Sequence, residues 1–274
     1  MGEQCEVYRL GCIPYTQAWL LQKRLAEERA ASMRPDCLLL LEHPHTFTLG
    51  RSAHVEHLLL TKDELQERGI EMHWVDRGGD ITYHGPGQLV GYPIMDLGKP
   101  QNEHCRIPQA DYVGYIRSLE AMMIRTISCF GIATGQIKEL TGVWVQPDIA
   151  ARSSHCPHYA HKAPAKIASI GVKVDRHGIS QHGFALNISP EMAHFSEIIA
   201  CGLREHCSIS MAELLPDPPN MAAVQDTLAT QFGSEFSREM VTATFDPNHL
   251  IQQQWQSVGK HKIIAKTHLT STNQ

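Results

Sequence analysis

Long apolar runs are missing from this chain of 274 residues. The longest purely apolar stretch covers 37–41, whereas a helix needs roughly 20 such residues to cross a bilayer. Acidic residues outnumber basic ones by 29 to 24, so the net charge of −5 supplies no overall positive field for nucleic acid. Residues 1–6 lack the basic start and the apolar stretch of a secretory signal. These absences predict a cytoplasmic protein that neither spans a membrane nor binds nucleic acid.

Common cofactor signatures are also absent. The eight cysteines include no Cys-x-x-Cys pair, which leaves zinc ribbons and thioredoxin-type redox sites without support. No Gly-x-x-x-x-Gly-Lys-Ser/Thr phosphate loop occurs, and no Gly-x-Gly-x-x-Gly follows a strand. Hydrophobic residues make up 42 % and charged residues only 19 %, which is the composition of a folded chain. The sequence therefore describes a folded protein without a nucleotide motif.

Apolar spacing predicts a mixture of strands and helices. We expect strands at 6–12, 37–41, 46–49, 71–75, 88–95, 166–174 and 179–186, and helices at 14–31, 61–69, 108–130 and from Asn220 onward. The last two strands should form a hairpin through the turn at 175–178. Because the elements do not alternate strictly as βαβ, the pattern favours an α+β domain built around a mixed β-sheet with flanking helices.

One polar segment stands out between these elements. It reads Arg77-Gly-Gly-Asp-Ile-Thr-Tyr-His-Gly-Pro-Gly-Gln88, with four glycines among polar side chains. Glycine lets a backbone approach a ligand and adopt positive φ, while the Arg, Thr, His and Gln side chains offer hydrogen bonds. By composition alone an ordinary turn-rich loop is the preferred interpretation, because glycine-rich loops are common.

Together with Tyr92-Pro, this segment resembles the signature of the lipoyl(octanoyl) transferases. Further motifs of that family follow in order: Leu41 to Gly50, Thr141-Gly-Val-Trp144, Lys166-Ile-Ala-Ser-Ile-Gly171, His182-Gly-Phe-Ala-Leu-Asn187 and Cys201-Gly202. The resemblance covers about residues 5–215. It implies the fold of the biotin/lipoate protein ligase catalytic domain, which is class II aminoacyl-tRNA synthetase-like. It also implies a catalytic domain at 1–215 followed by a mostly helical extension at 216–274.

The resemblance assigns two catalytic residues. The acyl-accepting cysteine of the family falls on Cys201, and its essential lysine falls on Lys166. Elementary chemistry agrees, because a thiol needs a nearby cation or base to be mostly thiolate at neutral pH. Ala200 stands where the family usually has proline, and Cys207 lacks the pattern, so we expect Cys207 to be structural.

The resemblance also assigns substrate-binding residues in three segments. Their small side chains and backbone amides suit an eight-carbon acyl chain and a thioester oxygen. The expected residues are Arg77, Gly78, Gly79, Asp80, Ile81, Thr82, Tyr83 and His84, then Ser169, Ile170 and Gly171, and finally Gly183, Phe184 and Ala185. For His84, substrate positioning and proton transfer both stay open.

A histidine-rich insertion separates Trp144 from Lys166. Its His155, Cys156, His158 and His161 are possible metal ligands, but the stretch suggests no helix or knuckle to hold them, so a polar loop is the preferred interpretation. The sequence accordingly predicts no metal and no cofactor for the reaction.

The implied activity is transfer of an octanoyl group from octanoyl-acyl-carrier protein to a lysine of lipoyl domains. The implied acceptors are the lipoyl domains of 2-oxoacid dehydrogenase E2 subunits and the glycine cleavage H protein. Two alternatives stay open on the same fold. One is an ATP-dependent lipoate or biotin ligase, which needs no cysteine, and the other is a non-catalytic module that binds an acyl group or a metal.

Overall fold

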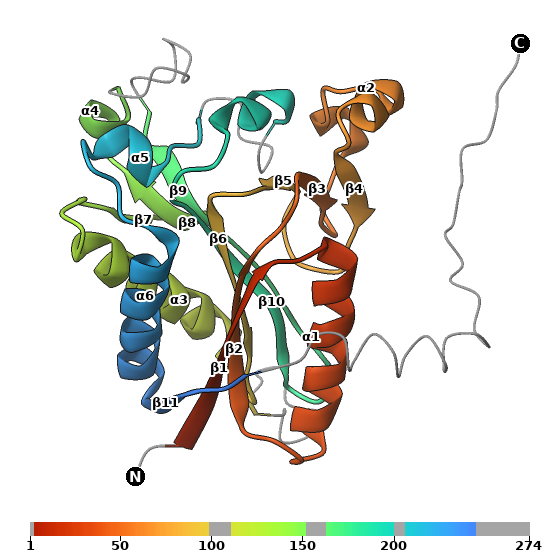
Figure 1. Ribbon diagram of the computed structural model, residues 1–274, viewed down its shortest axis with the longest axis vertical. Helices are drawn as coiled ribbons and strands as arrows, with labels where there is room; N and C mark the ends of the chain where they lie inside the picture. Colours follow the sequence, from red (N-terminus) through yellow and green to blue (C-terminus); the bar gives the residue numbers. More distant parts are fainter. Residues whose placement is uncertain (1–2, 99–110, 152–162, 200–205, 245–274) are drawn as a thin grey trace, which may run out of the picture. The chain divides into compact units, whose positions relative to one another are not determined.

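A mixed eight-stranded sheet runs through the structure, which is a computed structural model that describes residues 3–98, 111–151, 163–199 and 206–244 (Figure 1). The strand order is β11-β1-β2-β6-β10-β9-β8-β7. These strands are β1 (Glu3–Cys12), β2 (Asp36–Glu42), β6 (Gln88–Ile94), β7 (Gly135–Ile137), β8 (Leu140–Val145), β9 (Ala165–Val174), β10 (Ser180–Asn187) and β11 (Arg238–Thr242). A second, three-stranded sheet has the order β4-β3-β5, made of β3 (Thr46–Leu49), β4 (Glu71–Trp74) and β5 (Ile81–His84).

Helices cover both faces of the large sheet. The helices of the described residues are α1 (Tyr15–Ala30), α2 (Lys62–Glu67), α3 (Tyr112–Ser128), α4 (Pro147–Ala150), α5 (Met211–Leu214) and α6 (Met221–Phe236), with 3₁₀ turns η1 (Val55–His57) and η3 (Met192–Glu197). Of these, α2 and η3 pack against strands of the small sheet. In Figure 1, α1 lies on one side of the sheet and α3 and α6 lie on the other. The α+β class with a mixed sheet is therefore confirmed. Among the described residues, no helix has the length and hydropathy needed to span a membrane.

The sheet centre is formed by strands that are buried on both faces. Residues 37–41 of β2 are almost fully inaccessible, and so is all of β6. A continuous apolar run such as Cys37 to Leu41 fits this position, because a strand covered on both sides has no polar face. The neighbouring β10 pairs antiparallel with β6 and with β9, which confirms the predicted hairpin and ties it to the sheet centre.

Local sequence signals fix several helix ends as expected. The Thr61 side chain accepts from the Glu64 backbone amide and Glu64 reaches back to Thr61, which forms a capping box at the start of the expected helix. Asn220 caps α6 by accepting from the Ala223 amide. Gly69, after the short α2, has a φ of 64°, which glycine adopts without strain.

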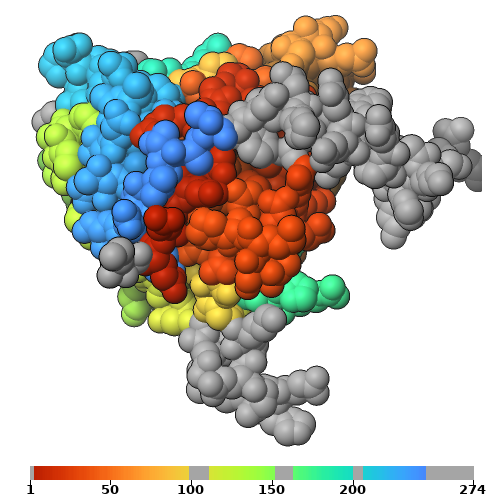
Figure 2. Space-filling view, turned by 60° about the horizontal axis from the view of Figure 1, so that its bottom comes forward, coloured from red at the N-terminus to blue at the C-terminus, as the bar shows by residue number. Residues whose placement is uncertain are grey.

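The structure adds one strand where the sequence predicts mainly helix. After α6, Ser237 adopts φ 52° and the chain turns into β11, which pairs parallel with β1 from Glu3↔Arg238 to Val7↔Thr242. Figure 2 shows this last described segment, in blue, against the N-terminal strand, in red. Such an edge strand shows little apolar alternation, because three of its five residues are exposed to solvent. Residues 3–244 thus include α6 and β11 within one compact unit.

The small sheet has two chemically different faces, and this division positions the site. Side chains alternate along a strand, so Ile81 and Tyr83 of β5 share one face with Phe47. Thr82 and His84 take the other face, opposite Thr48 and Thr46 in the antiparallel pairing. One face is therefore an apolar core, and the other presents polar groups.

Candidate active site

His84 sits at the centre of a buried chain of hydrogen bonds. Its Nδ1 lies 2.7 Å from Gln88 Oε1. The orientation of the Gln88 amide follows from its other end, where Nε2 donates to the Tyr83 carbonyl (3.1 Å) and to Asn187 Oδ1 (2.9 Å). An amide oxygen only accepts, so His84 Nδ1 carries the proton and Nε2 keeps a lone pair. His84 is thereby held as a neutral imidazole with one basic nitrogen.

Aromatic rings from separate elements gather around His84. Tyr15 of α1 stacks on it with ring centroids 6.1 Å apart, and His43 meets it edge-on at 5.7 Å. His43 in turn donates from Nδ1 to the Ile13 carbonyl (2.8 Å) and accepts at Nε2 from the Tyr92 hydroxyl (2.8 Å). Burial and these hydrogen-bond partners stabilise the neutral forms of His43 and His84. Burial lowers the pKa of His43 to about 4, and burial together with the neighbouring His43 lowers the pKa of His84 to about 3.

His182 completes this ring cluster from β10. Its Nε2 lies 2.8 Å from Asp76 Oδ1, while Lys173 Nζ lies 2.6 Å from the other carboxylate oxygen of Asp76. The hydrogen bond from His182, with that from Lys173, holds the pKa of Asp76 well below its usual range. Burial lowers the pKa of His182 despite the carboxylate, so an uncharged ring donates to a charged Asp76.

Arg77 is buried and shapes the glycine-rich segment. Its Nη2 donates to the Thr48 carbonyl (2.6 Å) and to Thr48 Oγ1 (2.9 Å). The same side chain runs past Gly171, where an added Cβ would lie 3.0 Å from Arg77 Cδ and 3.0 Å from the Gly78 carbonyl oxygen. The Gly78 amide donates to the Val172 carbonyl (3.0 Å). Glycine at position 171 therefore allows the 77–79 segment to lie directly on β9.

The hairpin places the two other expected substrate segments side by side. In the pairing of β9 with β10, Ser169 lies opposite Ala185, Ile170 opposite Phe184 and Gly171 opposite Gly183. A Cβ at Gly183 would lie 2.2 Å from the Gly91 carbonyl oxygen, and one at Gly91 would overlap the Phe184 ring. Small residues at these points let β6, β9 and β10 approach each other closely.

Not every residue of the 77–84 segment faces the His84 side. Ile81 and Tyr83 belong to the apolar core on the opposite face of β5. The Asp80 carboxylate accepts from its neighbouring Ile81 amide (2.7 Å) and from the His54 amide (3.2 Å), and it lies 2.5 Å from His57 Nδ1. The structure thus gathers Arg77, Thr82 and His84 and turns Asp80, Ile81 and Tyr83 toward other contacts.

Lys166 lies at the start of β9 with 8 % of its surface exposed. Its Nζ stands over the Trp144 ring at 4.7 Å from the centroid. Its backbone amide donates to the Cys207 carbonyl, and its carbonyl accepts from the Ile209 amide, both at 2.9 Å. The segment 206–209 is therefore fastened directly to the backbone of Lys166.

Cys201 and the insertion residues His155, Cys156, His158 and His161 lie outside the described residues. The chain on the two sides of 200–205 is anchored. On one side, the Ile199 amide donates to the His57 carbonyl (2.8 Å), and on the other, Ser208 bridges to Lys166. The described chain thus resumes five residues after Cys201, and the next residue, Cys207, is hydrogen-bonded to the backbone of Lys166.

Three of the four free thiols among the described residues have raised pKa values. Burial raises the pKa of Cys37 to about 12 and raises that of Cys5 further. Cys12 is exposed, yet its pKa is also raised, first by desolvation and then by Glu42. Cys129 is exposed at the end of α3. Thiols with raised pKa values are weak nucleophiles at neutral pH.

Several residues that surround His84 carried no site prediction. Tyr15 and His43 come from segments far from residue 84 in the sequence, and only the fold brings their rings together. Gln88, Tyr92 and Asn187 belong to the quoted motifs but were not assigned a binding role. For Gln88 the available signal was a polar residue at the start of an otherwise largely apolar strand.

Comparisons with known proteins give one consistent result. Residues 14–233 match the sequence profile of the family described as "Lipoyl protein ligase A/B catalytic domain". The chain is 40 % identical over 237 residues to a protein of Chloroflexus aggregans named octanoyltransferase, covering 86 % of this chain and 97 % of that one. It is 41 % identical over 234 residues to an octanoyltransferase of Solibacter usitatus, covering 85 % and 92 %.

Solved structures with the same fold are more distant in sequence. A bi-partite lipoate protein ligase from Thermoplasma acidophilum superimposes with a TM-score of 0.65 at 14 % identity, covering 93 % of this chain and 92 % of that one. A lipoate-protein ligase A bound with ATP gives 0.61 at 13 % identity, covering 93 % and 95 %. These matches confirm the expected ligase-like fold.

Proposed function

The chain belongs to the octanoyltransferase family, which carries the lipoyl protein ligase A/B catalytic domain, and from that premise we propose a cysteine–lysine mechanism of octanoyl transfer. The protein is an acyltransferase of lipoate biosynthesis. The donor is octanoyl-acyl-carrier protein, and the acceptor is a lysine of a lipoyl domain. The observation that carries the mechanism is the anchoring of 206–209 on the backbone of Lys166, just after Cys201 in the sequence.

The first half-reaction forms an acyl-enzyme. The Cys201 thiolate attacks the thioester carbonyl, a new carbon–sulfur bond forms, and the bond to the carrier's thiol breaks. The leaving thiolate takes a proton from the Lys166 ammonium. In the second half-reaction the acceptor lysine attacks the Cys201 thioester and forms an amide. Its surplus proton passes to Lys166, and the Cys201 thiolate is released.

The substrate-binding role belongs to the face that carries His84. Arg77 orders Gly78 and Gly79 against β9, while Ser169, Ile170 and Gly171 lie in register with Ala185, Phe184 and Gly183. The neutral His84, with its basic Nε2 fixed by Gln88, positions substrate rather than neutralising a charge. Asp80, Ile81 and Tyr83 support this face through the loop and through the core behind it.

The partners and location follow from the same chemistry. Lipoyl domains of 2-oxoacid dehydrogenase E2 subunits and of the glycine cleavage H protein are the proposed acceptors. A catalytic thiolate has to stay reduced, and a reducing cytoplasm, where we expect the protein to act, meets that requirement. The 1–215 segment would hold the residues of both half-reactions, and α6 and β11, which follow it, would support the site from outside.

Sequence similarity favours this mechanism over an ATP-dependent ligase. The relatives named octanoyltransferase are 40 % and 41 % identical to the chain, whereas the ligase structures share 14 % and 13 %. A ligase would activate a free acid with ATP and would not load a cysteine. Covalent loading without ATP therefore separates the two activities.

The test is intact-protein mass after brief incubation with octanoyl-acyl-carrier protein in the absence of ATP. Wild type should gain one octanoyl group, and addition of a lipoyl domain should remove it. Cys201→Ala should gain none, whereas Cys129→Ala, which removes an exposed free thiol, should load like wild type. Loading of Cys201→Ala, or transfer that requires ATP, would contradict the proposal.

A further inference from the structure

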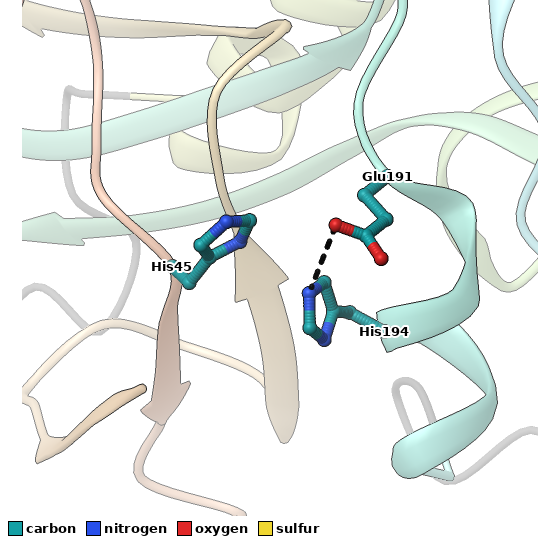
Figure 3. Close-up of side chains that lie close together, drawn as sticks. All are labelled: His45, Glu191 and His194. Carbon is teal, nitrogen blue, oxygen red and sulfur yellow. Dashed lines mark ion pairs between the residues drawn. The ribbon is translucent and has the colours of Figure 1, made fainter. Parts of the chain in front are cut away.

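A second group of potential ligands lies on the face of β5 opposite His84. His45 directly precedes β3, Glu191 directly precedes η3, and His194 lies within η3. One ligand atom of each residue lies within 4.8 Å of the others. Figure 3 shows the imidazoles of His45 and His194 and the Glu191 carboxylate converging between the small sheet and η3. We propose that these three residues bind a divalent transition-metal ion, for which zinc is the best match.

A hydrogen bond to Nδ1 of each histidine orients its ring as a metal ligand. The Tyr83 hydroxyl lies 2.7 Å from His45 Nδ1, and the Glu197 carboxylate lies 2.7 Å from His194 Nδ1. A carboxylate can only accept, so His194 Nδ1 carries the proton and Nε2 has the lone pair. A hydroxyl can donate and accept, so the Tyr83 hydroxyl can accept from His45 Nδ1 and leave Nε2 of His45 as the metal-binding nitrogen. Metal-binding histidines characteristically use the second ring nitrogen in this way.

Packing holds the rings in place before any ion arrives. The Tyr83 ring stacks on His194 at a centroid distance of 4.9 Å, and Phe195 meets Tyr83 edge-on at 5.3 Å. A side chain at Gly85 would collide with this arrangement, because its Cβ would lie 2.0 Å from the Tyr83 hydroxyl and 3.2 Å from His45 Nδ1. Gly85 thus leaves room for the bond between Tyr83 and His45.

The cluster needs a small closure to take up zinc. Zinc bonds of about 2.0–2.2 Å in a tetrahedron put ligand atoms roughly 3.3 Å apart. His194 Nε2 and Glu191 Oε2 are already 3.6 Å apart. The Glu191 side chain is 63 % exposed and free to turn, whereas the His194 side chain is only 11 % exposed and fixed. Rotation of Glu191 can therefore bring its carboxylate oxygen closer to His194 Nε2.

The donor set selects the class of ion. Two imidazole nitrogens and one carboxylate oxygen suit zinc or cobalt, and a fourth position is left for water. Calcium and magnesium prefer oxygen ligands only. An ordinary network of ion pairs, with His194 between Glu191 and Glu197, would leave these side chains in similar places, so metal affinity is the property that distinguishes the two.

The site does not take part in the transfer chemistry proposed above. It lies on the Tyr83 face of β5, whereas the proposed substrate site lies on the His84 face. Its effect would be to fasten η3, which leads toward Cys201 in the sequence, to the start of β3. Bound metal should therefore raise the thermal stability of the protein.

The experiment is a zinc titration of the full chain, prepared without an affinity tag and freed of metal by a chelator. The chain has 17 histidines, so the number of zinc ions bound by each variant has to be compared with that of wild type. A chromophoric chelator that competes for zinc reports the free zinc concentration in each titration. Wild type should bind one zinc ion at this site. Glu191→Gln and His194→Gln should bind that ion at least about tenfold more weakly. His177→Gln, a histidine in the β9–β10 turn, should bind like wild type.

Glu191→Gln also tests the proposal independently of folding, because its exposed side chain can change without disturbing the core. Zinc should raise the melting temperature of wild type and of His177→Gln but not that of Glu191→Gln. Cobalt should give wild type, and not the two ligand variants, the visible absorption of a tetrahedral site. Absence of zinc binding at micromolar concentration, or equal binding by wild type and Glu191→Gln, would overturn the proposal.

Discussion

Gln88 and Asn187 are joined by a hydrogen bond of 2.9 Å from the Gln88 amide nitrogen to Asn187 Oδ1, deep within the large sheet. On one side of this bond Gln88 holds His84, and on the other Asn187 donates to the Ile209 carbonyl over 3.1 Å. The Ile209 amide is itself bonded to the Lys166 carbonyl. Side chains of β5, β6 and β10 thus link His84 to the backbone of the proposed catalytic lysine.

Replacing Gln88 with leucine should lower both stability and activity. The change leaves His84 Nδ1, the Tyr83 carbonyl and Asn187 Oδ1 without their partner in a buried place. An unsatisfied buried polar group costs about 1–3 kcal/mol, so the free energy of unfolding in urea should fall by at least that amount. Gln17→Leu on the exposed side of α1 should change it little. Equal stability of Gln88→Leu and wild type would show that the chain of bonds is not important.

The buried histidines should make the fold sensitive to acid. Below about pH 6.5 the unfolded chain takes up protons on His43 and His84, but the folded protein holds their pKa values near 4 and 3. The unfolded state binds more protons in this window, so the free energy of unfolding falls as the pH falls. Between pH 7 and pH 5 the loss should be about 2 kcal/mol for each of the two residues.

A variant series separates this effect from general acid unfolding. His43→Gln keeps an uncharged side chain beside Tyr92 and should reduce the pH dependence of the unfolding free energy by one proton, about 1.4 kcal/mol per pH unit near pH 5. Gln17→Leu, which removes no titratable group, should keep the full slope. Denaturant titrations at several pH values give these slopes, and an unchanged slope in His43→Gln would disprove the assignment.

Adding a methyl group at Gly171 should displace the segment that contains Arg77. The new Cβ would lie 3.0 Å from Arg77 Cδ, which the bonds to Thr48 keep from moving away, and 3.0 Å from the Gly78 carbonyl oxygen. Overpacking of this kind costs about 1–3 kcal/mol. We expect Gly171→Ala to lower the unfolding free energy by that amount and to raise the KM for the acyl donor.

Gly135→Ala is the matched control for this change. Gly135 also lies in a strand, but nothing stands within 4 Å of an added Cβ. Its stability and KM should match those of wild type. If both alanine variants behave alike, the close approach of β9 to the 77–79 segment does not constrain the site.

Removing the ring beneath Lys166 should slow the transfer steps. The Trp144 ring lies 4.7 Å from Lys166 Nζ, and a cation over a buried aromatic ring gains about 0.5–2 kcal/mol. Trp144→Leu should lower kcat by about tenfold, and Trp144→Phe should recover much of the loss because it keeps an aromatic face. Rapid-quench measurement of acyl-enzyme formation would show both effects.

Lys23 Nζ on α1 lies 3.9 Å from the centroid of the Trp19 ring, and this comparable contact serves as a control. Lys23→Met should leave kcat unchanged. A Trp144→Phe variant as slow as Trp144→Leu would point to lost packing volume rather than to the cation–ring contact.

Short-range patterns predicted the elements well and the site incompletely. The strand at 46–49, the helix that begins after Thr61 and the hairpin after residue 165 all depend on neighbours in the sequence, and all are confirmed. The polar segment from Arg77 to Gln88 was identified from its residue types. Side chains alternate along a strand, so identifying 81–84 as a strand would also have predicted that Tyr83 and His84 lie on opposite faces.

By itself the sequence determined the α+β class, most element bounds and the family, because apolar spacing, caps and ordered motifs are local properties of the chain. Only the tertiary structure decided that His43, Tyr15 and Tyr92 enclose His84, and that His45 and His194 approach each other behind Tyr83. These contacts join strands and helices that are distant in sequence. The pairing of β3 with β5 and the position of η3 bring them together, and no local pattern encodes such distances.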